Sequence, residues 1–213
     1  MKKNIKAILF DFDGVLANTM EDNFIAWKKA FKDKGVEIER DDYFPLEGLQ
    51  LKHVAETIGN KYCIDKKYYE DVVRFKNKYY LDNHTFSFYE GVTELVDLLV
   101  KNNMKLAIVT ASNKERLEKT VPENFLNKFE VIISGEDYVN GKPNPEPYLT
   151  AMKKLKISSE ECIVVENAPL GVESAKSAGA YCVAITSTLE KKYLKEADEI
   201  IGKFLELLGI LNV

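Results

Sequence analysis

Chemically reactive side chains gather in four short segments, three of which directly follow strand-like apolar runs. The four segments are Asp11-Phe12-Asp13-Gly14, Thr110-Ala111-Ser112-Asn113, Gly141-Lys142-Pro143 and Glu166-Asn167. In an open parallel sheet, ligands bind outside the carboxyl ends of the strands, so these segments should converge at one edge. The carboxylates suit a hard cation, whereas a hydroxyl and a lysine suit the oxygen atoms of an anion. Together the four segments predict a site for a cation and an oxyanion.

Each segment taken alone also has an ordinary structural interpretation. Asp13-Gly14 is a common turn signal, and Thr110 and Ser112 are typical helix-capping residues. Lys142 is one of many lysines in the chain. Four complementary clusters at successive strand ends do not arise readily from independent surface residues, and their combination is what indicates function.

The elements that must position these residues alternate along the chain. Short apolar runs predict five buried parallel strands, at residues 5–10, 106–110, 131–134, 162–166 and 181–185. Helical patterns lie between them, at residues 92–99, 145–155 and 169–178. Repeated strand–helix units of this kind predict an α/β fold with right-handed crossovers.

One segment interrupts this alternation with helical patterns alone. Met20, Phe24, Trp27 and Phe31 recur at helical spacing and form one apolar face. Residues 51–58 and 68–81 predict two further helices, the second rich in tyrosine. We therefore expect a sheet-containing core formed by residues 1–17 and 89–213, with residues 18–88 inserted as a small helical domain over the sheet edge.

The composition is that of an ordinary folded protein and excludes several classes. Lys and Arg number 30 and Asp and Glu 34 among 213 residues, a formal net charge of -4, which argues against a nucleic-acid partner. No apolar run approaches the roughly 18 residues of a membrane helix. The apolar stretch after Met1-Lys2-Lys3 ends at Asp11, so it predicts a strand, and the protein is expected in the cytoplasm. The three cysteines lack CxxC spacing and fit reduced thiols.

The four segments, in this order, resemble the motifs of the haloacid dehalogenase superfamily. The matching runs are residues 11–19 for the first motif, Thr110-Ala111-Ser112 for the second, Gly141-Lys142-Pro143 for the third, and Val164-Val165-Glu166-Asn167 with Gly171, Ala175 and Gly179 for the fourth. The chain is most similar to the β-phosphoglucomutase-like and phosphoglycolate phosphatase-like subfamily. The resemblance implies a Rossmann-like parallel sheet core with an α-helical cap inserted between the first and second motifs.

The chemistry implied is phosphoryl transfer, with each role assigned to a motif residue. Asp11 is expected to attack phosphorus and form an aspartyl-phosphate, which water then hydrolyses. Asp13 lies two residues on, so it points to the same side of an extended segment and serves as general acid and base. Thr110, the backbone N–H of Ala111 and Lys142 should hold the phosphoryl oxygens.

A cation is expected beside these carboxylates, because two carboxylates and a dianionic phosphate repel one another. Oxygen ligands in this number suit Mg²⁺. The resemblance places Mg²⁺ on the Asp11 side chain, the Asp13 carbonyl and the pair Glu166-Asn167. Relatives commonly carry a second Asp where this chain has Asn167, whose amide oxygen can coordinate but adds no charge.

The cap sequence bears on the substrate. Mutases of the subfamily use a cap His and a cap Arg, and those positions correspond here to Asn23 and the neighbourhood of residues 51–52. These departures weaken a mutase interpretation. Asn23, Lys52 and Lys76 are the candidate substrate-contacting residues of the cap, and a solvated helix face is the ordinary interpretation of the two lysines.

The sequence therefore predicts a Mg²⁺-dependent phosphatase acting on a small phosphorylated metabolite, such as a sugar phosphate or phosphoglycolate, in a monomer or weak dimer. A β-phosphoglucomutase-type isomerase is the main alternative. A dehalogenase is disfavoured because halide departure does not need the acid Asp13, and a phosphonate hydrolase would need a cap Schiff-base lysine, for which only Lys52 offers itself. A non-catalytic binding protein would not need both Asp11 and Asp13.

Overall fold

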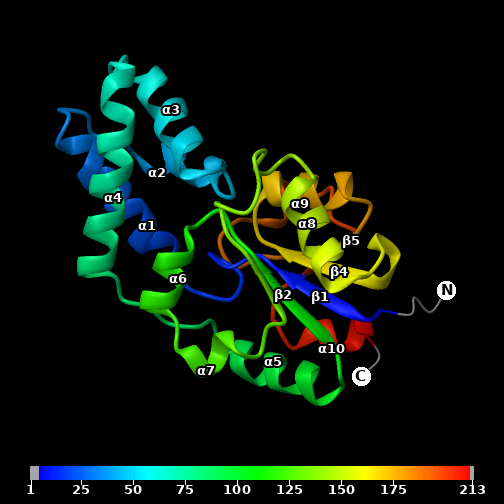
Figure 1. The fold of residues 1–213 in the computed structure, drawn as a ribbon. Coiled ribbons are helices and arrows are strands. Elements are labelled where there is room, and N and C mark those ends of the chain that lie inside the picture. Colours follow the sequence, from blue (N-terminus) through cyan, green and yellow to red (C-terminus); the bar gives the residue numbers. More distant parts are fainter. Residues whose placement is uncertain (1–4, 212–213) are drawn as a thin grey trace.

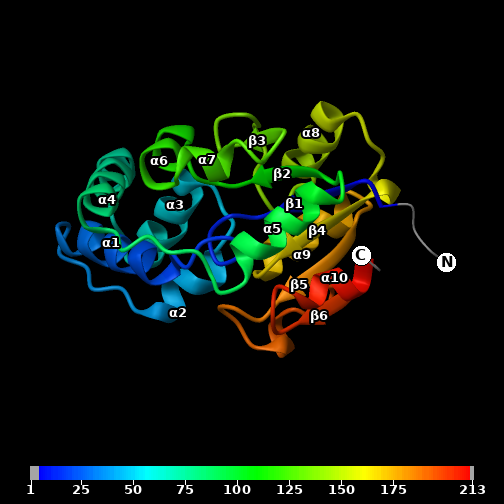
Figure 2. The ribbon, with the colours of Figure 1, turned by 90° about the horizontal axis from the view of Figure 1, so that it is seen from below.

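Six parallel strands form one sheet in the spatial order β3-β2-β1-β4-β5-β6 within residues 5–211, the part of the chain that the computed structural model describes (Figures 1 and 2). The strands are β1 (Ala7–Phe10), β2 (Lys105–Val109), β3 (Val131–Ile133), β4 (Cys162–Glu166), β5 (Tyr181–Ile185) and β6 (Glu199–Ile201). All five predicted strands are confirmed, and with them the α/β class. The sequence analysis misses β6, because this strand has three residues and begins with the exposed Glu199, so it leaves no buried apolar run.

The register of the central strands brings the predicted site residues to one level. β1 lies between β2 and β4, and Phe10 pairs with both Ile108 and Val165. Since the three strands run in the same direction, the residues that follow them emerge at the same edge. Asp11 and Glu166 leave the sheet side by side for this reason.

Helices cover both faces of the sheet (Figure 1). They are α5 (Val92–Lys101), α6 (Lys114–Thr120), α7 (Glu123–Leu126), α8 (Glu146–Leu155), α9 (Pro169–Ser177) and α10 (Glu206–Leu211). Ile8 and Phe10 of β1 pack into one core with α5 and α10, whereas Ala7 and Leu9 pack into a second core with α8 and α9. This alternation along β1 is the pattern of a strand buried on both faces. No helix within residues 5–211 has the length and apolar character needed to cross a membrane.

A separate group of helices stands beyond the carboxyl ends of the strands, as Figures 1 and 2 both show. It contains α1 (Met20–Lys32), α2 (Arg40–Tyr43), α3 (Leu51–Lys61) and α4 (Tyr69–Asn83), with 3₁₀ turns at Phe44–Leu46 and Lys66–Tyr68. These helices have their own hydrophobic core, in which Trp27 and Phe31 of α1 pack against residues of α3 and α4. The inserted α-helical cap of the predicted fold is thus present, and we propose residues 18–88 as its extent.

The two chain segments that join cap and core run side by side. The backbone N–H of Asn18 donates to the carbonyl of Ser87 at 2.9 Å, and Ala17 forms an isolated antiparallel bridge with Phe88. Cap movement relative to the sheet would therefore act through one narrow pair of segments.

Candidate active site

Lys142 connects the ends of β1 and β4. It comes from the loop after β3, and its Nζ donates to Asp11 Oδ1 at 2.5 Å and to Glu166 Oε1 at 2.6 Å. It also donates to the carbonyl of Val109 at 3.2 Å, at the end of β2. All three charged side chains are almost fully buried. One lysine thus holds together the residues that follow three strands.

The charges in this group are not balanced by Lys142 alone. Burial raises the pKa of Asp11 to about 8, since the attraction of Lys142 is partly cancelled by the nearby carboxylates of Glu166 and Asp13. Burial opposes the charged form of Lys142, but Asp11 and Glu166 outweigh it and raise the pKa of the lysine. The cluster therefore holds more acidic than basic groups, and a further positive charge would stabilise it.

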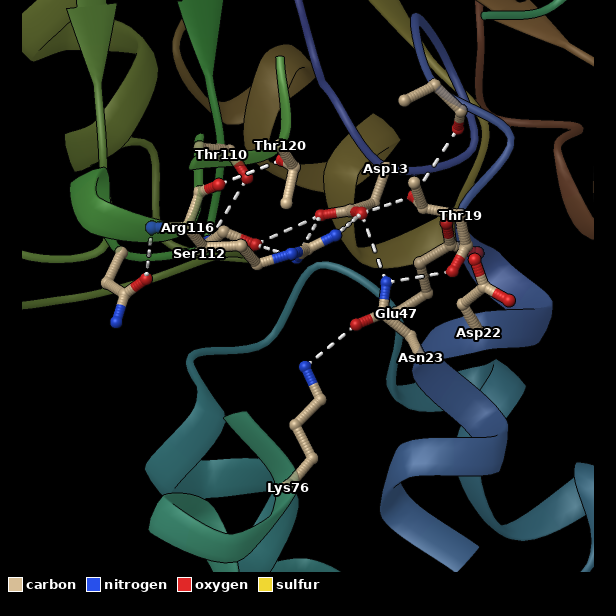
Figure 3. A network of polar contacts seen from close by, with 12 residues as sticks. Asp13, Thr19, Asp22, Asn23, Glu47, Lys76, Thr110, Ser112, Arg116 and Thr120 are labelled. Carbon is tan, nitrogen blue, oxygen red and sulfur yellow. Dashed lines mark hydrogen bonds and ion pairs between the residues drawn. The ribbon is translucent and has the colours of Figure 1, made fainter. Parts of the chain in front are cut away.

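The carboxylate of Asp13 points toward the cap and is surrounded by donors (Figure 3). Its Oδ1 accepts from Thr19, from Asn23 Nδ2 at 3.0 Å and from Arg116 Nη2. Its Oδ2 accepts from Ser112 Oγ at 3.1 Å and from Arg116 Nη1 at 3.0 Å. Asp13 therefore meets Arg116 in a two-pronged ion pair, the strongest geometry between these groups.

Arg116 is a site residue that the sequence analysis misses. It lies in the first turn of α6, is buried, and stacks over the ring of Tyr80 in α4 at 4.1 Å. Burial alone would raise the pKa of Asp13, but Arg116 outweighs it and lowers this pKa to about 2. One sequence signal could have indicated a helix here: Asn113 caps α6, and its side chain accepts from the backbone N–H of Arg116 at 3.1 Å.

Two of the three predicted cap residues reach the site. Lys76 of α4 donates to Asn23 Oδ1 at 2.7 Å, and Asn23 in turn donates to Asp13 (Figure 3). Lys76 is only 1% exposed, and burial followed by repulsion from Arg116 places its pKa well below the usual value. Lys52 is not brought into this cluster, since its side chain is 79% exposed on α3. It lines an outer cavity of about 570 Å³ that lies between the cap and α6.

Glu47 is a second residue that the sequence analysis misses. It lies in the loop between the 3₁₀ turn Phe44–Leu46 and α3, and it is buried against the core. Its Oε1 accepts from Asn167 Nδ2 at 2.5 Å, and its Oε2 accepts from Thr188 at 3.5 Å. Burial, reinforced by the carboxylates of the site, holds the pKa of Glu47 well above its usual range. Nothing in the local sequence distinguishes it from a solvated loop acid.

Whether the site can bind a cation depends on the oxygen atoms of the fourth motif, which come from Glu166 and Asn167. Both carboxylate oxygens of Glu166 already accept hydrogen bonds, Oε1 from Lys142 and from Tyr148 at 2.6 Å and Oε2 from the backbone N–H of Asn167 at 3.0 Å. Asn167 Oδ1, by contrast, is buried and has no hydrogen-bond partner among the described residues. Asn167 Oδ1 is therefore the oxygen of this motif that most needs a cation.

Side-chain acids alone do not make a metal site here. Between residues 5 and 211, no three His, Cys, Asp or Glu side chains are arranged to hold a metal ion. The donors would be the Asp11 carboxylate, the Asp13 carbonyl and the Asn167 amide oxygen, completed by water and substrate. Such a mixed oxygen set is what Mg²⁺ accepts, since it retains several waters.

The cap closes over this chemistry. Asp11, Thr110 and Ala111 of the core and Asn23, Glu47 and Lys76 of the cap line one narrow cavity. Its volume is about 40 Å³, which holds roughly three water molecules. Of the predicted residues, those that line this cavity are Asp11, Asp13, Thr110, Ala111, Asn23 and Lys76. Lys142 donates to Asp11 and Glu166, and Asn167 donates to Glu47, whereas Lys52 lies apart from them.

A parallel sheet that presents two aspartates, a hydroxyl and a lysine beneath a helical cap defines a hydrolase of one superfamily. The chain belongs to the haloacid dehalogenase-like hydrolase family, which matches residues 8–185. The predicted family and the enzyme class are thereby confirmed.

Similar proteins include named phosphatases and a mutase. Validoxylamine A 7'-phosphate phosphatase of Streptomyces hygroscopicus subsp. limoneus is 30% identical over 95% of both chains. Phosphorylated carbohydrates phosphatase of Thermotoga maritima is 28% identical over 98% of this chain and 99% of its own. The crystal structure of β-phosphoglucomutase from Clostridium difficile is 25% identical, with a TM-score of 0.84 over 98% of this chain and 97% of its own. The predicted subfamily fits these relatives.

Proposed function

We propose that this protein is a Mg²⁺-dependent phosphatase that hydrolyses a small phosphorylated metabolite through an aspartyl-phosphate on Asp11. The observation that carries the proposal is the buried contact of Asp11 with Lys142 at 2.5 Å, at the strand end where Asp13 and Thr110 also emerge. A carboxylate nucleophile, a fixed cation and a second carboxylate are the groups that phosphoryl transfer needs.

Each residue has a place in two successive steps. Asp11 attacks phosphorus while Lys142, Thr110 and the backbone N–H of Ala111 hold the phosphoryl oxygens. Asp13 is ionised while it is paired with Arg116, so it must first separate from that residue and take up a proton from solvent. It then gives this proton to the leaving alkoxide and later removes a proton from the water that attacks the aspartyl-phosphate. The carboxylate of Asp13 must first exchange donors from its present network for the substrate oxygen.

The cation would be held by the Asp11 carboxylate, the Asp13 carbonyl and Asn167 Oδ1. When bound, Mg²⁺ supplies the positive charge that lets a dianionic phosphate approach the carboxylates. Glu166 contributes indirectly, because it and Tyr148 fix the position of Lys142, whose Nζ lies 5.0 Å from the Tyr148 ring centroid.

The substrate enters only when the cap moves. A cavity of about 40 Å³ cannot hold a sugar phosphate, so the paired segments at Asn18 and Ser87 would act as the hinge. Asn23 and Lys76 then return over the organic part of the substrate. The relative named for phosphorylated carbohydrates supports a sugar phosphate as that substrate.

A phosphate-moving isomerase is the second candidate. The similar structure of a β-phosphoglucomutase favours it, and it would share the aspartyl-phosphate step. It would be identified by formation of glucose 6-phosphate from β-glucose 1-phosphate without net release of phosphate.

The test is phosphate release from a panel of phosphorylated metabolites with Mg²⁺. We expect Asp11→Asn to fold normally and to lose at least about 10³-fold in activity, since the nucleophile is removed. Asp97→Asn, which changes an aspartate with a 61% exposed side chain, should retain full activity. Full activity in Asp11→Asn, or an enzyme indifferent to chelation of the metal, would refute the proposal.

A further inference from the structure

The neutral side chain of Asn167 lies against a buried carboxylate that comes from the cap. Glu47 Oε1 is 2.5 Å from Asn167 Nδ2, and Glu47 is 4% exposed. We propose that Glu47 supplies, from the cap, the negative charge that Asn167 does not give to the cation site. Cation binding and cap closure would then stabilise each other. This inference rests on the proposed Mg²⁺-dependent function.

Glu47 is the acid of this site that has no cation beside it. Lys142 pairs with Asp11 and Glu166, and Arg116 pairs with Asp13. Among the described residues, Glu47 forms no ion pair within 4.0 Å, and its hydrogen bonds come from Asn167 and Thr188. A buried carboxylate without a positive partner is costly, so its position calls for one.

The amide of Asn167 independently indicates a ligand. Its Nδ2 is used twice, toward Glu47 and toward Thr188 Oγ1 at 2.9 Å, which fixes the orientation of the amide group. Its Oδ1 is left buried and without a partner in the described part of the chain, although Asn167 is 0% exposed. An unsatisfied buried oxygen is rare in folded proteins, and a bound cation would satisfy it.

The first motif approaches the same pair closely. A Cβ atom added to Gly14 would lie 2.0 Å from Asn167 Nδ2 and 2.6 Å from Glu47 Oε1, and the φ of Gly14 is +80°. The peptide between Asp13 and Gly14, whose carbonyl is an expected ligand, therefore lies directly beside Asn167 and Glu47. Glycine is needed here because any side chain would separate the loop from this pair.

Because Glu47 belongs to the cap and Asn167 to the core, their contact exists only when the cap is closed. With the cation bound, the Glu47 carboxylate would be attracted to the site, and without it the carboxylates of Asp11 and Glu166 repel it. Coupling between two such events is reciprocal: whatever closure adds to cation affinity, the cation adds to closure.

The test measures Mg²⁺ binding directly, by titration calorimetry without substrate. Glu47→Gln keeps an oxygen to accept from Asn167 and removes the charge, so we expect Mg²⁺ affinity to fall 10- to 100-fold, as for residues that support metal ligands. The double variant Glu47→Gln with Asn167→Asp returns a charge to the same place and should recover most of the affinity. Glu56→Gln, on α3 of the same cap and lining the outer cavity, is the matched control and should bind as the native protein does.

A second readout follows the cap itself. Small-angle scattering should show the native protein becoming more compact on addition of MgCl₂, and Glu47→Gln should show less of this change. Unchanged Mg²⁺ affinity in Glu47→Gln, or no recovery in the double variant, would overturn the role of Glu47 while leaving the proposed phosphatase intact. A native protein that releases phosphate without binding Mg²⁺ would instead overturn the metal dependence of the proposed function.

Discussion

The ion pair between Asp13 and Arg116 should be a measurable source of stability. Arg116→Leu keeps much of the side-chain volume but leaves the partly buried Asp13 carboxylate in contact with neutral donors only. The pKa of Asp13 is lowered from 3.8 to about 2. At about 1.4 kcal/mol per pKa unit, this lowering corresponds to about 2 kcal/mol of folding free energy at pH 7. The loss on breaking a buried pair is of the same order.

The dependence on pH has a definite sign. Because the folded-state pKa of Asp13 lies below the unfolded value, the stabilisation is complete above pH 3.8 and is lost as the pH falls toward 2. At pH 3 about half of it should remain. The difference in stability between the native protein and Arg116→Leu should therefore shrink over this range.

The assay is urea unfolding in a double-mutant cycle with Asp13→Asn, which isolates the pair from other effects of each substitution. We expect a coupling free energy of about 2 kcal/mol at pH 7. A coupling below about 0.5 kcal/mol, the level of an exposed ion pair, would refute the argument. So would a coupling that is the same at pH 7 and pH 3.

Two further substitutions test the other half of the site. Lys142→Met leaves the carboxylates of Asp11 and Glu166 buried without their shared cation. We expect it to lower the free energy of unfolding, measured with urea or heat, by about 3–5 kcal/mol and to abolish phosphate release. Unchanged stability would contradict the ion-pair geometry. Gly171→Ala would place a Cβ 1.9 Å from Glu166 Oε1, so Glu166 must shift with Lys142, and phosphate release should fall at least about 10-fold. Gly209→Ala is its control, because no atom lies within 4 Å of the added Cβ, and it should leave activity unchanged.

Much of the fold follows from local pattern. The five predicted strands are largely apolar, since helices cover both faces of the sheet, and this makes them visible in the sequence. The end of α9 is equally plain, because Gly179 takes a φ of +78° two residues after the last helical residue, Ser177. β6 escapes prediction because a short edge strand needs few apolar residues, and its pairing with β5 is decided by tertiary structure.

The site residues likewise fall into those that the sequence predicts and those that it does not. Asp11, Asp13 and Glu166 are predictable because they follow the central strands, where topology alone brings them together. Arg116 and Glu47 are not, because each reaches the site through tertiary contacts that no local pattern encodes. Arg116 of the seven-residue helix α6 pairs with Asp13 of the first motif, and the loop residue Glu47 reaches Asn167 through the packing of cap against core.

The distribution of charge across the site favours one orientation of the bound substrate. On the side of the fourth motif, Asp11 and Glu166 share Lys142, and Glu47 has no ion-pair partner among the described residues, so acidic groups are in excess there. On the cap side two basic groups, Lys76 and Arg116, lie near each other, and burial first, then repulsion from Arg116, disfavours the charged form of Lys76 and lowers its pKa. A bound cation would correct the first imbalance and an anionic substrate the second. A phosphate ester that bridges the cation and these cap-side groups would therefore place its phosphorus between Asp11 and Asp13, as an attack on one side and protonation on the other require.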